Sequence, residues 1–208
     1  FEKILPNLHG VQSALPLLLP FIAVFISLLF STILTHLELH NKSHVRNLLA
    51  PVNDLLYPLG LLLTAYIIIF FQLFILLLVV QMQFGLDVFS HFSSLFVLLS
   101  VFVLFFICLG MIIAYLSKQV QTSILLSTFL SLGFFLLSDA LVALEAMPRV
   151  VYFFASFNPV VLVGNMLHQL LFFGFSFGSY LEEFILLLIY MVLALLVLFF
   201  IARRRHRA

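Results

Sequence analysis

The side chains best suited to chemistry lie in one short polar stretch, residues 38–54, between two long hydrophobic runs. Lys42 and Arg46 are four residues apart there, so a helix would carry both on one face. Pro51 breaks a helix near the end of the stretch, and three histidines lie in or beside it: His36, His40 and His44. This pattern is typical of one or two helical turns in a membrane interface. Such an element could take a push from a soluble partner, or its charges could only fix the topology of an ordinary loop.

No other arrangement of residues points to catalysis or to a bound ion. The sequence has no Gly-x-x-x-x-Gly-Lys-Ser/Thr loop, so it lacks the phosphate cradle that such a loop supplies. Ser, His and Asp are present, but no spacing brings them together as an intramembrane enzyme would need. His168 stands near Asn165 and Gln169, and histidines without carboxylate or cysteine neighbours seldom bind metal. We therefore expect no catalytic, cofactor or metal site in this chain.

The elements that must position the polar stretch are membrane helices. Of the 208 residues, 65% are hydrophobic and only 8% are charged, and the mean hydropathy is +1.31. Soluble domains are about half apolar and about a quarter charged. The composition therefore indicates an all-α, polytopic integral membrane protein, and the net charge of +1 gives no indication of nucleic acid.

The hydrophobic runs predict how often the chain crosses the membrane. A run of about 20 residues spans the hydrocarbon of a bilayer. Residues 1–208 are predicted to form a single transmembrane domain with five spans: 17–37, 55–82, 94–116, 123–144 and 184–202. The second of these runs is long for an upright span, so we expect it to tilt.

Residues 145–183 have two interpretations. A short apolar piece and a longer, polar-interrupted piece are separated by Asn158-Pro159, and they form either a re-entrant helix pair or a sixth span. With five spans, one side of the membrane carries most of the basic residues: Lys42, Arg46, Lys118 and the arginines at 203–207. The positive-inside rule favours this arrangement, with the pair re-entrant on the outer side and the C-terminal tail in the cytosol.

Two sets of residues resemble motifs of a known family. In the polar stretch, Glu38 and the pair Lys42-Ser43 are followed by Pro51, eight residues after the Ser, and by Gly60, nine residues after the Pro. These spacings are similar to those in the first cytosolic loop of the permease subunits of type-2 ABC exporters, also called type V exporters. Leu37, Lys42 and Leu61 depart from that family's arginine, glycine and lysine.

The second set lies before the last span. The sequence has Ser138-Asp139, then Met147-Pro148, then Asn158-Pro159, with His168 near where the family often carries an arginine. This order of motifs resembles that of the same family, although Asp139 replaces a glycine. The family has six spans, so the resemblance implies that one span before these five is absent from the sequence.

The resemblance implies mechanical work rather than catalysis. ATP and Mg would be bound by a separate ABC ATPase subunit, and the other partners implied are a second permease copy or homologue and membrane lipid, in the plasma membrane. The residues expected to couple to the ATPase are Glu38, Lys42, Ser43, His44, Arg46 and Pro51. Those expected at an outer gate or re-entrant turn are Asp139, Met147, Pro148, Asn158 and Pro159.

Two further questions stay open at the level of sequence. An ATP-independent channel or secondary transporter is the alternative function, and such a protein usually carries buried carboxylates or an internal repeat. Asp139 is the acidic residue placed to serve in this way. The substrate is expected to be apolar or amphipathic, because Leu, Phe and small hydroxyl residues make up the spans.

Overall fold

A computed structural model of the chain describes residues 6–40, 56–84, 92–138, 146–173 and 180–206. Its described residues form α-helices and no strands, which confirms the predicted all-α polytopic class. The helices are α1 (Pro6–His40), α3 (Leu56–Phe84), α4 (Phe92–Leu116), α5 (Val120–Leu136), α6 (Arg149–Ser156), α7 (Pro159–Phe173) and α8 (Leu181–His206).

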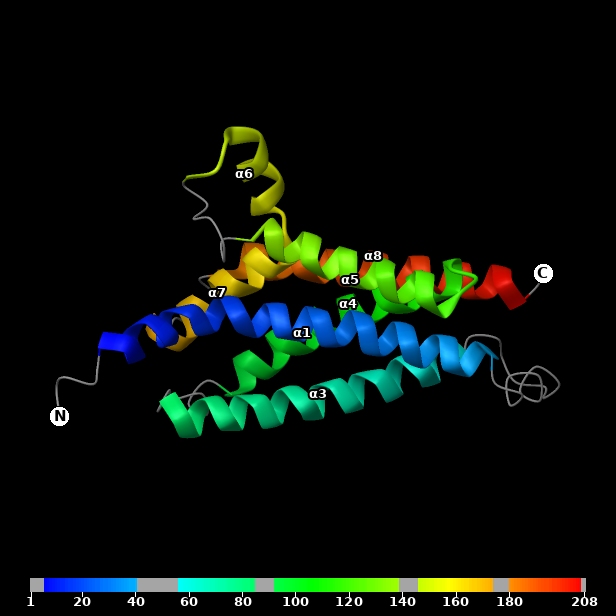
Figure 1. Ribbon diagram of the computed structural model, residues 1–208, viewed down its shortest axis with the longest axis horizontal. Coiled ribbons are helices and arrows are strands. Elements are labelled where there is room, and N and C mark those ends of the chain that lie inside the picture. The colour runs from blue at the N-terminus through cyan, green and yellow to red at the C-terminus, as the bar shows by residue number, and fades with distance from the viewer. Residues whose placement is uncertain (1–5, 41–55, 85–91, 139–145, 174–179, 207–208) are drawn as a thin grey trace.

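Four of the described helices are long and apolar enough to cross a membrane. Their spans are Leu18–Leu39, Leu56–Gln83, Phe92–Leu116 and Leu181–Arg204. α5 is apolar but shorter, with 17 residues, and it lies along the same bundle (Figure 1). The helix ends at Leu136, whereas the predicted span extends to residue 144. It ends there because Ser138 closes the last turn, with its backbone N–H and its hydroxyl both donating to the carbonyl of Phe135.

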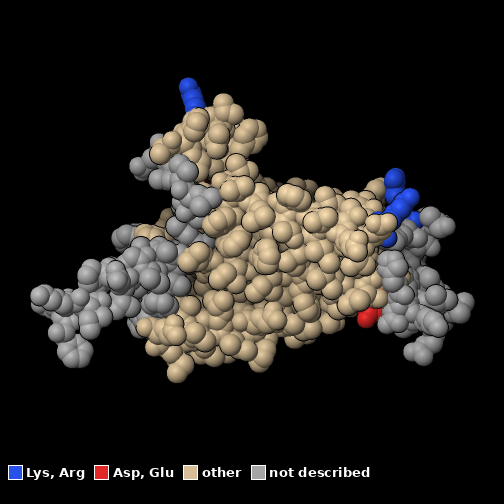
Figure 2. Space-filling model, viewed as in Figure 1, with Lys and Arg blue, Asp and Glu red and all other residues tan. Residues whose placement is uncertain are grey.

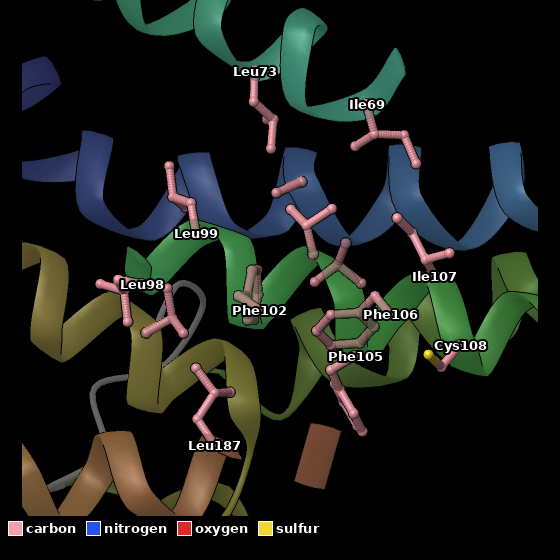
Figure 3. Close-up of a cluster of buried hydrophobic side chains, with 14 of the residues drawn as sticks. Ile69, Leu73, Leu98, Leu99, Phe102, Phe105, Phe106, Ile107, Cys108 and Leu187 are labelled. Atoms are coloured by element: carbon pink, nitrogen blue, oxygen red, sulfur yellow. The ribbon is translucent and has the colours of Figure 1, made fainter. Parts of the chain in front are cut away.

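α4 is the centre of the bundle. Of its span, 61% is buried, against 28% for α3 and 22% for α8, and it packs against α1, α3 and α8. Figure 3 shows Phe102 and Phe106 of α4 among apolar side chains of neighbouring helices, including Leu73 of α3 and Leu187 of α8. The two phenylalanine rings meet edge to face, with 4.9 Å between their ring centroids. Aromatic pairs prefer this arrangement. α4 is apolar along its whole length because other helices cover most of its surface.

The long helices alternate in direction, which gathers several chain segments at one end of the bundle. α1, α4 and α8 run one way, and α3 and α5 run back (Figure 1). The end of α1, the α4–α5 turn and the end of α8 therefore lie together. We call this the basic end, because it carries Lys118, Arg203 and Arg204 (Figure 2). The described charges of the opposite end are Arg149, Glu182 and Glu183.

This arrangement predicts the outcome of a labelling experiment. Cysteines introduced as Lys118→Cys and Arg203→Cys should react with a membrane-impermeant maleimide from the same side of sealed vesicles, and Arg149→Cys should react from the other side. The native chain is the control, since Cys108 is buried and should stay unlabelled. Labelling of Lys118→Cys and Arg203→Cys from opposite sides would contradict the fold.

Candidate functional site

A row of buried polar side chains joins α1 to α5, and we call it the polar seam. Its members are fully buried: Ser27, Ser31, Thr32, Thr35 and His36 of α1, and Ser123, Ser127 and Ser131 of α5. The three serines of α5 are spaced by four residues, so they lie on one face of the helix. Buried polar groups in a membrane must find partners within the protein. The seam is therefore where α1 and α5 are held in a fixed register.

Hydrogen bonds across the polar seam link three helices. The hydroxyl of Thr32 donates to the backbone carbonyl of Gly110 in α4 at 3.1 Å, and its oxygen lies 2.7 Å from the hydroxyl of Ser127. A hydroxyl has one hydrogen, so Thr32 accepts the bond that Ser127 donates. Nearer the basic end, Nε2 of His36 is hydrogen-bonded to the hydroxyl of Ser123. Bonds of this kind between membrane helices contribute about 0.6 kcal/mol each and at most about 1.7.

Gly110 lets α4 approach α1 closely enough for this contact. A Cβ atom at this position would collide with the hydroxyl of Ser31 and would lie 2.7 Å from the backbone carbonyl oxygen of Leu28. Small residues permit such close packing of membrane helices. Gly110 and Thr32 thus form one contact, in which the missing side chain brings the backbone of α4 within reach of the hydroxyl.

A second polar cluster lies at the corner between α6 and α7, near the far end of α5. The two helices form a pair bent by 71° at residues 157–158. Asn158 is buried and uses its whole amide: Oδ1 accepts from the N–H of Val160 at 3.0 Å, and Nδ2 donates to the carbonyl of Phe134 at 2.7 Å. The first bond caps the start of α7. The second satisfies a carbonyl in the last turn of α5, which has no partner within its own helix.

Two further features fix the same corner. Pro159 is the first residue of α7, where its fixed φ suits a helix and its missing N–H is not needed. The hydroxyl of Tyr190 in α8 donates to the carbonyl of Phe157 at 3.1 Å. The corner is therefore tied to both α5 and α8.

The structure brings together only some of the residues predicted for an outer gate or re-entrant turn. Asn158 and Pro159 meet at the corner, as just described. Met147 and Pro148 stand before α6, where Pro148 is the N-cap residue and is exposed, while Met147 is partly exposed. Asp139 lies outside the described residues.

Of the predicted coupling residues, the structure describes Glu38. It is partly exposed in the last turns of α1, at the basic end. The others, Lys42, Ser43, His44, Arg46 and Pro51, lie outside the described residues.

The sequence prediction missed the polar seam, although a signal was present. Ser123, Ser127 and Ser131 follow at intervals of four in an otherwise apolar helix, and Ser27 and Ser31 repeat that interval in α1. Such spacing places hydroxyls on one face of each helix. Which other helix each face meets is not contained in the spacing.

The described polar side chains take part mainly in helix packing. Within the described ranges, no three His, Cys, Asp or Glu side chains come together as a metal site would require. Exposed His168 on α7 belongs to no such group. Within the polar seam, Thr32 and His36 of α1 bond to Ser127 and Ser123 of α5. The hydroxyls of Ser31, Thr35 and Ser131 instead donate to carbonyls of their own helices.

Comparison with known proteins gives one match. A family model described as ABC-2 type transporter matches residues 1–172, which include both polar clusters. No curated protein matches, and no solved structure matches.

The close contact at Gly110 predicts the effect of a single methyl group. Gly110→Ala should lower the melting temperature of the purified protein by several degrees, because overpacking a tight contact costs about 1–3 kcal/mol. Gly133→Ala is the matched control, since a Cβ at that position in α5 would meet no atom within 4 Å beyond the backbone of its own helix. Equal melting temperatures for the two variants would contradict the contact.

The amide of Asn158 predicts a ranked series of variants. Asn158→Ala should be destabilised, because loss of a cap costs about 1 kcal/mol and an unsatisfied buried carbonyl costs about 1–3 more. Asn158→Asp should be at least as unstable, since it keeps the acceptor for Val160 but sets a carboxylate oxygen against the carbonyl of Phe134 in a buried site. Asn165→Ala, at an exposed position of the same helix, should match the native protein in a thermal melt. If Asn158→Asp has the same melting temperature as the native protein, the hydrogen bond from Asn158 to Phe134 of α5 does not contribute to stability.

Proposed function

Since the chain belongs to the ABC-2 type transporter family, we propose that it exports an apolar or amphipathic substrate with energy from a separate ATPase subunit. Its role as a membrane permease subunit follows from the family. The direction of transport, the energy source, the partners and the kind of substrate are the content of the proposal.

One observation carries the proposal: the segments that could receive a soluble subunit all reach the basic end. In the sequence, α1 leads from the basic end into the polar stretch, and the α4–α5 turn and the end of α8 reach the same end of the bundle (Figure 1). The positive-inside rule puts an end rich in lysine and arginine in the cytosol, where ATP is available. The C-terminal tail would then be cytosolic, and the α6–α7 corner would face outward.

ATP and Mg would be bound by the partner, because the sequence lacks a phosphate-binding loop. The proposed contact is the polar stretch, through Glu38, Lys42, Ser43, His44, Arg46 and Pro51. The stretch is short and joined to α1 and α3, so a push on it would move both helices. A dimer of permease subunits with two ATPases would apply that push symmetrically.

The polar seam supports a route by which such a push would travel. His36 is in the last turns of α1, and its bond to Ser123 ties the end of α1 to the start of α5. α5 then runs away from the basic end for 17 residues, and its far end is bonded to Asn158 at the α6–α7 corner. Tilting α1 would thus shift α5, and α5 would shift the corner that we propose as the outer gate.

The distribution of charge supports an apolar or amphipathic substrate. The described charged residues lie near the ends of the long helices, in the α4–α5 turn and at the start of α6, and none lies in the middle of a span. An ion or a highly charged molecule would meet no opposite charge on the way. The same distribution speaks against a secondary transporter, because the carboxylates of the described part, Glu38, Glu182 and Glu183, are all at least partly exposed.

The proposal is tested by reconstitution with the ATPase subunit. Lys42→Glu combined with Arg46→Glu should weaken ATPase binding roughly tenfold or more, because two attractive charges become repulsive across the interface. ATP-dependent transport should fall with it. Arg149→Glu, at the opposite end, is the matched control and should bind the ATPase normally.

Two results would contradict the proposal. One is full-rate transport by the permease alone, without the ATPase or ATP, which would favour the channel or secondary transporter. The other is equal ATPase binding by the native chain and by the Lys42→Glu, Arg46→Glu variant, which would remove the polar stretch from the interface.

A further inference from the structure

A groove lies at the basic end between the α4–α5 turn and the last turns of α8. Its volume is about 490 Å³, and residues from both elements line it, including Lys118 and Arg204. The residues proposed above to contact the ATPase do not include these two side chains. The groove therefore raises the question of what it binds.

The groove brings two cations together without a counter-charge in its walls. Lys118 comes from the α4–α5 turn and Arg204 from the end of α8, both are exposed, and no acidic residue lines the groove. The guanidinium carbon of Arg204 lies 4.4 Å from the centre of the Phe200 ring. This cation–π contact holds the guanidinium in place and leaves its N–H groups available, because the ring face replaces no conventional acceptor. A guanidinium and an ammonium that line the same groove are suited to an anion such as a phosphate.

The walls of the groove are apolar and accessible. The side chains of Leu116 and Phe200 are 67% and 57% exposed, and Ile201 lines the groove beside them. A free phosphate ion would gain nothing from such walls. A ligand with a hydrocarbon part would cover them.

A second groove continues the same path toward the middle of the bundle. It has a volume of about 310 Å³ and is lined by α4 and α8 residues, among them Ile112 and Val197. These lie one helical turn before Leu116 and Ile201 of the first groove. Its lining is apolar apart from Tyr190. Along the α4–α8 contact, a cationic groove is therefore followed by an apolar one, which is the order of headgroup and acyl chain in a phospholipid.

We propose that the paired grooves bind an anionic phospholipid, with its phosphate between Lys118 and Arg204 and an acyl chain along α4 and α8. Basic pockets between membrane helices recognise acidic lipid headgroups in this way. The inference does not depend on the substrate or on the ATPase. A lipid bound here would join the α4–α5 turn, where α5 begins, to the end of α8.

Binding is measured on the purified full chain in neutral detergent by native mass spectrometry and thermal melting. Phosphatidylglycerol should remain bound and raise the melting temperature, whereas phosphatidylcholine should do neither. Lys118→Gln combined with Arg204→Gln should weaken phosphatidylglycerol binding roughly tenfold or more, since each surface cation contributes to the attraction of an anionic lipid. Arg149→Gln is the control for general loss of positive charge and should bind like the native chain.

Further controls distinguish lipid binding from phosphate binding, and a loss of binding from a failure to fold. Inorganic phosphate and glycerol phosphate should give no protection, because they lack the acyl chain. Lys118→Arg combined with Arg204→Lys keeps both charges and should retain the lipid, which covers the case in which the glutamine variant folds poorly. The proposal is overturned if phosphatidylcholine protects equally, if glycerol phosphate protects as well as the lipid, or if Arg149→Gln loses as much lipid as the double variant.

Discussion

The structure depends on the close contact between α1 and α4 at Gly110. Hydrophobic side chains gain little by leaving lipid for one another, so membrane helices are held by close packing and by polar bonds. The missing side chain of Gly110 lets the hydroxyl of Thr32 reach a backbone carbonyl of α4. Thr32 in turn accepts a hydrogen bond from the hydroxyl of Ser127 in α5. One hydroxyl thus fixes the central helix relative to two neighbours. The aromatic packing of Phe102 and Phe106 adds buried apolar contact but does not by itself set the register of the helices.

The consequence of this contact is that α5 is held at both ends and along one face. Ser123 ties its start to α1, and the carbonyl of Phe134 near its end is bonded to Asn158. A helix of 17 residues thus links the basic end to the α6–α7 corner. We propose that a movement of the permease passes along this helix from one end to the other. The same bonds that stabilise the bundle are those we propose to carry that movement.

The two ends of the bundle differ in the physics that holds them. The α6–α7 corner is fixed by directional bonds from Asn158 and Tyr190, in a place where backbone groups need internal partners. The basic end presents charges to water and to lipid headgroups, and its grooves are open. We propose that this end is occupied from outside the chain, by an ATPase at the polar stretch and by an anionic lipid beside α8. Hydrogen bonds within the chain at one end and external partners at the other are consistent with the proposal that the permease is driven from its basic side.

The sequence by itself determined the class of the protein and the end at which its charges gather. Both follow from properties of local segments. Runs of apolar residues form membrane helices, and because successive helices alternate in direction, Lys118 and the C-terminal arginines lie at one end. It also identified Asn158 and Pro159 as a break between two helices, which local capping chemistry explains. Only the tertiary structure decided that α5 stops at Leu136, that Thr32 meets Ser127, and that Asn158 reaches Phe134. These contacts join residues far apart in the chain, and they depend on how each helix is rotated and crossed against its neighbours, which hydropathy and spacing do not specify.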